Sequence, residues 1–335
     1  MKRYCLLLLA LVIILTGCQW PADKSQLQRV TYLNLFDTVT TILAADDSEA
    51  DFLEKAGQIY ENLLFYHQLF DIYQEYEGIN NLKTINDQAG VAPVTVDPAI
   101  IELLLFCRDA CELTGGKVNI AMGSVLRLWH EARQANALPD TAALEEAALH
   151  TDFSCIEIDE AASTVYISDP ASSLDVGAIA KGWATQQVAQ AAPTGMLISV
   201  GGNVCATGPR EDSGTPWSIG IQDPDAPEQY LQRLRITQGA VVTSGDYQRF
   251  FTVDGKNYHH IIDPDTRMPS EFWRSVTVIC DDSGLADVLS TALFLLPLED
   301  GMALAAQCDA EALWLDAAGN THTTPDFYTL VAPQD

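Results

Sequence analysis

The sequence predicts an α+β fold with mixed, largely antiparallel sheets and flanking helices. Helical periodicities and short β-branched runs both occur along the 335 residues, and many of the strand-like runs are separated by hairpin-sized gaps. No Gly-rich fingerprint follows the first strand, which counts against a doubly wound dinucleotide-binding fold. Apolar residues make up 48% of the chain, so a large core is expected.

The first half of the chain is predicted to be mainly helical. Residues 30–43 mix Thr, Val, Ile and Leu and indicate a strand or hairpin. Residues 47–69 place apolar side chains three and four apart behind a plausible N-cap at Ser48, which predicts a helix. Further helices are expected at 98–114 (before Gly115-Gly116), at 121–135 and from Pro139 onward, and 155–167 alternates as a hairpin.

The second half is predicted to consist mainly of strands. A helix at 179–192 precedes a strand at 196–200, and a second helix is expected at 285–296. Further strands are predicted at 217–222, 234–237, 240–243, 250–253, 276–280, 314–315 and 328–331. No Pro/Gly/Ser-rich linker interrupts residues 30–335, so this range is predicted to form one catalytic unit.

The N-terminus has the pattern of a lipoprotein signal. Lys2 and Arg3 precede an apolar stretch from Leu6 to Leu15, which is too short to span a bilayer, since spanning takes about 20 residues. Cleavage before Cys18 would free that thiol for lipidation. We therefore expect residues 1–17 to be a signal peptide and 18–29 a lipidated tether, with the protein anchored on the extracytoplasmic face of the cell membrane. The alternative is a plain signal peptide with a coincidental cysteine.

Charge and cysteine content exclude several classes of function. The formal net charge of −28 repels nucleic-acid phosphates and anionic lipid, so we expect no nucleic-acid partner and no basic membrane patch. Cys5 lies in the predicted signal, and the six cysteines after Cys18 are scattered through apolar segments. No CxxC pair occurs among them, so most are predicted to be small buried hydrophobes rather than zinc ligands.

Two Gly-containing turns are candidate binding segments. In residues 174–183, Gly177 and Lys181 stand where a helix begins, and helix N-terminal amides with an ammonium group suit a phosphate. The simpler interpretation is a strand–turn–helix with a surface lysine. Residues 199–203 end in Gly-Gly-Asn, which would let a ligand lie against the backbone; in isolation a tight hairpin turn is favoured.

Two further segments carry candidate chemistry. His259 and His260 would point to opposite faces of an extended segment, so one could face a cleft as a general base while the other has a structural role. Asp287 and Thr291 share a helical face and offer hard oxygen ligands for Mg²⁺, although ordinary helix positions explain them as well. Aromatic residues near Phe36 and Tyr73 could stack on a heterocycle or simply fill the core.

Taken in order, these segments resemble the ApbE family of FAD:protein FMN transferases. The resemblance runs from about Thr31 to near the C-terminus. Its strongest parts are DVGAIAKGWA at 175–184, SVGGN at 199–203, TSGDYQRFF at 243–251, YHHIIDPDT at 258–266 and ADVLSTALF at 286–294. Five ordered motifs are far more specific than any single motif.

The resemblance implies a role for particular residues. His260 matches the more regular histidine of its motif and would be the base that activates an acceptor threonine. The metal would be Mg²⁺, held by side-chain oxygens of Asp287 and Thr291 and by backbone carbonyls of Ala178 and Ser290. The implied FAD contacts are Phe36, Tyr73, Asn119, Ile120, Ala121, Met122, Asp175, Lys181 and Ile261.

The sequence also departs from the family pattern. Arg267 stands where Gly is usual, so its turn is expected to differ locally; Asn119 replaces a frequent Asp, Phe36 a frequent Met and Ser290 a frequent Ala. The implied reaction transfers FMN from FAD to a threonine of a flavoprotein subunit of an electron-transfer system and releases AMP. Three alternatives remain open: a Mg²⁺-dependent FAD pyrophosphatase, a non-catalytic FAD-binding lipoprotein, and a solute-binding lipoprotein of a transporter.

Overall fold

The fold is built on one antiparallel sheet, as the computed structural model shows for residues 26–46, 48–211 and 213–332. The predicted signal, Cys18 and most of the tether lie outside these ranges. The strand order is β1-β2-β6-β7-β10-β13-β14-β15, and every neighbouring pair is antiparallel. The strands are β1 (Gln26–Leu35), β2 (Thr38–Asp46), β6 (Met196–Val200), β7 (Asn203–Ala206), β10 (Gly239–Gly245), β13 (Ser275–Cys280), β14 (Glu311–Leu315) and β15 (Thr321–Thr323). The predicted α+β class is confirmed.

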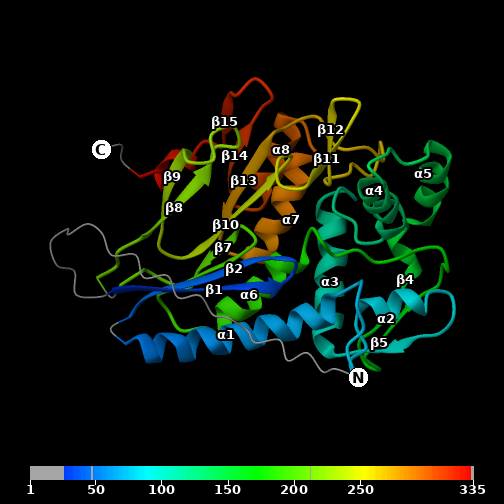
Figure 1. The fold of residues 1–335 in the computed structure, drawn as a ribbon, viewed down its shortest axis with the longest axis horizontal. Helices are drawn as coiled ribbons and strands as arrows, with labels where there is room; N and C mark the ends of the chain where they lie inside the picture. Colours follow the sequence, from blue (N-terminus) through cyan, green and yellow to red (C-terminus); the bar gives the residue numbers. More distant parts are fainter. Residues whose placement is uncertain (1–25, 47, 212, 333–335) are drawn as a thin grey trace, which may run out of the picture.

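Helices cover one face of this sheet, which we call the helix face (Figure 1). They are α1 (Glu49–Phe70), α6 (Ala180–Ala191), α7 (Ser283–Phe294) and α8 (Leu298–Gln307). Helix α1 begins as predicted, because the Ser48 side chain accepts a hydrogen bond from the backbone N–H of Asp51. Helix α7 is buried along nearly its whole length and packs with Ile198, Val242 and Val278 of the sheet in the largest core cluster.

A hairpin covers the opposite face, which we call the hairpin face. Strands β8 (Trp217–Gln222) and β9 (Tyr230–Ile236) pair with each other, and the β8 side chains alternate between buried and exposed. Residues 328–331, predicted as a strand, are largely the 3-10 turn η3 (Phe327–Leu330), so that prediction is wrong. The reason is local: the buried Phe327 closes the hairpin-face core, and the Thr329 hydroxyl donates back to the Asp326 carbonyl.

A largely helical lobe is inserted between β2 and β6 (right side of Figure 1). It contains α2 (Leu82–Asp87), α3 (Pro98–Leu113), α4 (Gly123–Ala135), α5 (Thr141–Ala147) and the small sheet β3 (Val94–Thr95), β5 (Thr164–Ile167) and β4 (Ile156–Asp159), with short 3-10 turns η1 (Ala148–His150) and η2 (Phe153–Cys155). The hairpin β11 (Phe250–Val253) and β12 (Lys256–His259) rests on this lobe, since Phe251 and Tyr258 contact Trp129 of α4. The lobe and the main sheet thereby share one cleft.

Most predicted elements are present, and the unpredicted ones are short except for α8 with its ten residues. Helices α2 and α8 and strands β3, β7, β12 and β15 were not predicted from the sequence. The six described cysteines are all free, but only Cys107 and Cys205 are buried and the other four are partly exposed, so the prediction that most are buried holds for two of the six. Burial raises the pKa of both thiols. Among the described residues, none of the helices combines the length and apolar character needed to span a membrane.

Three hairpins turn on two residues that both have positive φ. In the β6–β7 turn these are Gly201 and Gly202, as the alternative interpretation of the SVGGN motif expected. In the β11–β12 turn they are Asp254 (50°) and Gly255 (79°). In the β1–β2 turn they are Phe36 (51°) and Asp37 (50°), with no glycine. Left-handed backbone is unfavourable for side-chain-bearing residues, so the β1–β2 turn is strained.

Candidate functional site

A cleft of about 590 Å³ lies between the helix face of the sheet, the inserted lobe and the β1–β2 turn. Each of the five motifs contributes to its walls: Asp175 and Lys181 before and within α6, Gly201 and Asn203 of the β6–β7 turn, Ser244 of β10, His260 after β12, and Asp287 of α7. Segments that are more than a hundred residues apart in the sequence therefore meet at one site.

The back of the cleft is formed where α6 crosses α7. A Cβ at Gly182 would lie 2.4 Å from the Cβ of Asp287 and 2.5 Å from the carbonyl oxygen of Ser283, so only glycine permits this approach. The Gly182 N–H donates to the Asp287 carboxylate (2.9 Å), and the Lys181 ammonium lies 3.9 Å from it. Burial raises the pKa of Asp287, while Lys181 and the Gly182 N–H act in the opposite direction.

The two charged side chains of the DVGAIAKGWA motif, Asp175 and Lys181, are both hydrogen-bonded to Gly177 in the turn before α6. The Asp175 carboxylate accepts the N–H of Gly177 (2.9 Å), and the Lys181 ammonium donates to the Gly177 carbonyl (2.8 Å). The backbone of Asp175 is joined to the inserted lobe, because its N–H donates to the Ile120 carbonyl (2.8 Å). These contacts keep the Lys181 ammonium beside both the turn and Asp287, where it can meet an anionic ligand.

A row of hydroxyl groups lies beside Asp287. The Ser244 hydroxyl is 2.8 Å from that of Ser290 and 3.5 Å from that of Thr291. Ser290 is fully buried and its hydroxyl donates to the Asp287 carbonyl (3.0 Å), whereas Thr291 lines the cleft. The predicted pair Asp287 and Thr291 thus shares a cleft-facing side of α7.

The two adjacent histidines point in opposite directions, as an extended segment requires. The side chain of His259 is buried, and its Nε2 lies 2.7 Å from the Ser270 carbonyl. The side chain of His260 opens into the cleft, and its Nδ1 lies 3.2 Å from the Arg249 carbonyl. Because a carbonyl only accepts, this contact places the proton on Nδ1 and leaves Nε2 of His260 free as a base.

The environment of His260 favours its neutral form. The surrounding cleft walls lower its pKa, and the cationic Arg249 guanidinium and Lys181 ammonium lower it further. The ring itself remains exposed to the cleft, where a substrate can reach it. A neutral imidazole at physiological pH is the form that can accept a proton.

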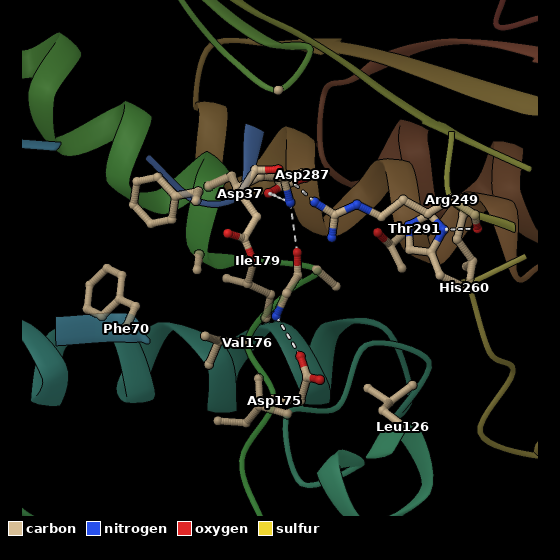
Figure 2. Close-up of a pocket in the computed structure, with 18 of the residues that line it drawn as sticks. Asp37, Phe70, Leu126, Asp175, Val176, Ile179, Arg249, His260, Asp287 and Thr291 are labelled. Carbon is tan, nitrogen blue, oxygen red and sulfur yellow. Dashed lines mark hydrogen bonds and ion pairs between the residues drawn. The ribbon is translucent and has the colours of Figure 1, made fainter. Parts of the chain in front are cut away.

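Arg249 is the main residue that the sequence analysis did not single out. One guanidinium nitrogen donates to the Asp37 carbonyl (3.3 Å), and the side chain lines the cleft next to His260. Figure 2 shows Arg249, His260 and Thr291 grouped together, with Asp287 and Asp37 beside them and Asp175 further away. The signal was present, because Arg249 lies within the TSGDYQRFF motif, but nothing in the sequence separated it from a surface arginine.

The mouth of the cleft carries aromatic and basic side chains. The Tyr73 hydroxyl is hydrogen-bonded to Nδ1 of His130 (3.1 Å), and Arg133 lies one turn further along α4. Partial burial raises the pKa of Tyr73, and the nearby Asp175 carboxylate adds to this shift. On the β1–β2 turn, the Phe36 ring meets that of His67 edge-on. Such a mouth can accommodate a flat ring system.

The cleft brings together nearly all of the residues that the family resemblance implied. The lining includes Phe36, Tyr73, Asn119, Ile120, Met122, Asp175, Ala178, Lys181, His260, Ile261, Asp287 and Thr291. Ala121 and Ser290 are fully buried and are not part of the lining. Asp37 and Thr38, from the same segment as Phe36, also line the cleft. So do residues that were not nominated from the sequence: His67, Lys117, His130, Arg133 and Arg249.

The turn at Arg267 was expected to differ locally from one with glycine, yet Arg267 has the backbone conformation that glycine would adopt most easily. Arg267 has φ of 60°, which is the left-handed conformation that glycine favours. Its N–H donates to the Asp263 carbonyl (2.7 Å), and its carbonyl accepts the indole N–H of Trp129 (2.9 Å). Two hydrogen bonds to the backbone of the turn thus hold Arg267 in a conformation that is unfavourable for its side chain.

Known proteins share both the sequence and the fold. The model of the ApbE family matches residues 36–314. An FAD:protein FMN transferase from Treponema pallidum is 34% identical over 262 residues, covering 71% of this chain and 72% of that protein. Another from Klebsiella pneumoniae is 35% identical over 246 residues, covering 70% and 76%. The ApbE protein from Thermotoga maritima superposes with a TM-score of 0.84 at 28% identity, covering 92% of this chain and 100% of that one.

Proposed function

The chain belongs to the ApbE family and transfers FMN from FAD to protein; we propose that the transfer depends on Mg²⁺, modifies a threonine hydroxyl and releases AMP. The observation that supports this proposal best is the grouping of a neutral base, two cations and a buried carboxylate in one cleft. These are His260, Arg249 with Lys181, and Asp287.

The donor set at α7 suits Mg²⁺. Asp287 and Thr291 would supply side-chain oxygens, and Ala178 and Ser290 backbone carbonyls. No group of three or more His, Cys, Asp or Glu side chains in the described part of the chain is placed to hold a metal. A site with one carboxylate suits Mg²⁺, which usually keeps waters and substrate phosphates among its ligands. When bound, Mg²⁺ polarises phosphoryl oxygens and offsets charge on the departing AMP.

His260 is the proposed general base. Its Nδ1–H is directed at the Arg249 carbonyl, so Nε2 can take the proton of the threonine hydroxyl. The threonine oxygen then forms a bond to the FMN phosphorus, and the bond from that phosphorus to the bridging pyrophosphate oxygen breaks. AMP leaves with that electron pair. The products are FMN-threonine, joined by a phosphoester, and AMP.

Two cations of the cleft offset the anionic substrate. The chain has a formal net charge of −28, which repels a pyrophosphate at long range. Lys181 and Arg249 face the same cleft. Within the described part of the chain the Arg249 guanidinium donates one hydrogen bond, to the Asp37 carbonyl at 3.3 Å, so several of its N–H groups are available. We propose that these two side chains bind phosphate oxygens and stabilise charge as the pyrophosphate bond breaks.

The same geometry would also hydrolyse FAD if water took the place of threonine. That reaction yields FMN and AMP, so dependence on an acceptor protein separates the transferase from a pyrophosphatase. A flavin carrier without chemistry would bind FAD and form neither product. We propose as acceptor a flavoprotein subunit of an extracytoplasmic electron-transfer system, and a lipid anchor at Cys18 that keeps enzyme and acceptor at one membrane surface.

The proposal is tested with the chain without its predicted leader, FAD, Mg²⁺ and a candidate acceptor domain. We expect flavin fluorescence that remains on the acceptor after denaturation, and an FMN-sized mass on one threonine. The adduct should disappear with EDTA or with Asp287→Ala. Metal-dependent AMP release without an adduct for any acceptor would favour the pyrophosphatase, and tight FAD binding with neither product would exclude catalysis.

A further inference from the structure

The buried histidine beside the proposed base is hydrogen-bonded through both ring nitrogens. His259 is 8% exposed. Its Nδ1 accepts the backbone N–H of Ile261 (3.2 Å), and its Nε2 lies 2.7 Å from the Ser270 carbonyl. An N–H can only donate and a carbonyl can only accept, so both contacts form only in the neutral tautomer with its proton on Nε2. Burial lowers the pKa of His259, in keeping with that neutral form.

These contacts continue to the end of α7. The Ser270 hydroxyl donates to the Phe294 carbonyl (3.1 Å), and the His259 ring meets the Phe294 ring edge-on with centroids 5.5 Å apart. Phe294 is the last residue of α7, the helix that carries Asp287 and Thr291. A short buried path therefore joins the residue next to His260 to the helix that would hold the metal.

His260 itself is held weakly. Its ring makes a 3.2 Å hydrogen bond to the Arg249 carbonyl and is otherwise open to the cleft. The position of the His260 ring is therefore set mainly by the backbone on either side of it. The His259 side chain fixes that backbone through its hydrogen bonds to the Ile261 N–H and the Ser270 carbonyl. A displacement of the base by about 1 Å can lower a rate by about 100-fold.

We propose that His259 is a positioning residue that fixes His260 relative to Asp287 and Thr291, acting through Ser270 and Phe294. The inference rests on the proposed function of His260. His259 does not face the cleft and both of its nitrogens are occupied, so it is neither a second base nor a metal ligand. The acidic groups that face it are Asp246 and Glu271, and neither is hydrogen-bonded to its ring.

The first test compares His259→Phe, His259→Gln and the control His150→Phe in the full chain. Phenylalanine keeps the ring packing and removes both hydrogen bonds, while glutamine keeps a donor for the Ser270 carbonyl. We expect His259→Phe to lower kcat for FMN transfer about 10- to 100-fold with KM for FAD changed less than about twofold, and His259→Gln to recover part of that loss. His150 pairs with Asp169 away from the cleft, so its variant should match the native chain.

A folded His259→Phe variant with native kcat would overturn the proposal, and so would a folded His259→Gln variant that recovers nothing. If His259→Phe does not fold, Ser270→Ala carries the test, because it removes the hydroxyl bond to the Phe294 carbonyl, together with a long 3.5 Å contact from the Phe272 N–H, and keeps the Ser270 carbonyl that His259 contacts. Its kcat should fall several-fold, and an unchanged kcat would count against the proposal.

A second readout does not depend on turnover. In ¹⁵N-labelled protein at pH 7, His259 should be the neutral tautomer with its proton on Nε2, and His259→Gln should shift the His260 ring resonances while those of His150 stay unchanged. A protonated His259, or unshifted His260 resonances, would overturn the positioning role. If the native chain forms no FMN-threonine with any acceptor, the proposed function of the cleft is wrong. The NMR measurement would still show whether His259 fixes the position of the His260 ring.

Discussion

The two faces of the main sheet differ in the kinds of side chain that they bury. The helix face buries polar and charged groups, including Asp287, Asn203 and Ser290, and it forms the wall of the cleft. The hairpin face buries an almost wholly apolar cluster that includes Trp217, Ile219 and Leu313. Buried polar groups cost stability unless they are fully paired, whereas apolar burial provides it. Both faces therefore stabilise the fold, because the helix face also packs the largest apolar core cluster, but only the helix face carries the chemistry.

The largest expected effect is a loss of activity without a loss of stability. Asp287→Ala should lower the rate of FMN transfer about 1000-fold or more, because it removes the proposed carboxylate ligand of the metal. In EDTA the variant should be at least as stable as the native chain, since the native state buries a carboxylate whose pKa is raised. Adduct formation and urea unfolding measure the two quantities. If Asp287→Ala in EDTA is much less stable than the native chain, Asp287 also stabilises the fold, and this contrast between the two faces is contradicted.

The same carboxylate predicts a pH dependence of stability. Its folded pKa is raised, so its contribution to stability is full below the unfolded carboxyl pKa and declines as the pH rises through the folded value. Asp287→Asn should therefore gain stability over the native chain as the pH increases from about 4 to 7. Unfolding free energies in EDTA at several pH values test this, and a difference that is constant with pH would contradict it.

The converse change on the hairpin face should affect stability alone. Trp217 is 4% exposed, and its indole N–H donates to the Gly208 carbonyl (3.0 Å). Trp217→Ala should lower the free energy of unfolding by about 3–5 kcal/mol, by analogy with other large-to-small core substitutions. The kcat of the molecules that remain folded should match that of the native chain. A loss of kcat at native FAD affinity would show that the two faces are coupled.

A smaller effect is expected when the positive charge of Arg249 in the cleft is removed. The base must be neutral, and Arg249 helps to lower the pKa of His260. Arg249→Gln should therefore raise that pKa, and the acidic limb of the pH profile of kcat/KM should move upward by about one pH unit. The substitution Arg127→Gln, on the exposed side of α4, is the control and should leave the limb in place.

The smallest expected effect compares two turns of the same kind. Asp37 of the β1–β2 turn lines the cleft, whereas Asp254 of the β11–β12 turn does not; both have φ of 50°. Glycine relieves a left-handed backbone at some entropic cost, so Asp37→Gly and Asp254→Gly should each stabilise by about 0.5 kcal/mol. Only Asp37→Gly should lower kcat. Equal kcat in the two variants would mean that the strained turn has no part in the site.

The sequence predicted the elements that carry long periodic patterns and missed those that tertiary packing determines. Helix α1 was foreseen from the spacing of Phe52, Ala56 and Ile59 behind the Ser48 cap, and all three are buried. Helix α2 has only six residues, too few for a periodic pattern, and the residues after Phe327 turn because that ring enters the core. Short segments follow their tertiary surroundings rather than their own propensity.

The residues of the site could be identified from the sequence, but their arrangement in space could not be predicted from it. Asp175, His260 and Asp287 were nominated individually, yet their convergence depends on sheet pairings and on the close approach at Gly182. Arg249 could not be singled out, because its importance comes from the proximity of His260 and of the Asp37 carbonyl rather than from its neighbours in the sequence. The choice of His260 over His259 came from the family resemblance, and the structure supplies its physical basis, because the His259 ring is buried while that of His260 faces the cleft.

The pairing of β2 with β6 has a consequence for the order of folding. Thr40 of β2 lies opposite Val200 of β6, and the residues of the whole inserted lobe stand between these two strands in the sequence. During synthesis the β1–β2 hairpin emerges early, but its inner edge has no partner until β6 has been translated. Such a non-local contact closes slowly, and an open strand edge can pair with other chains in the meantime. Yield in the cell should therefore depend on how long that edge stays uncovered.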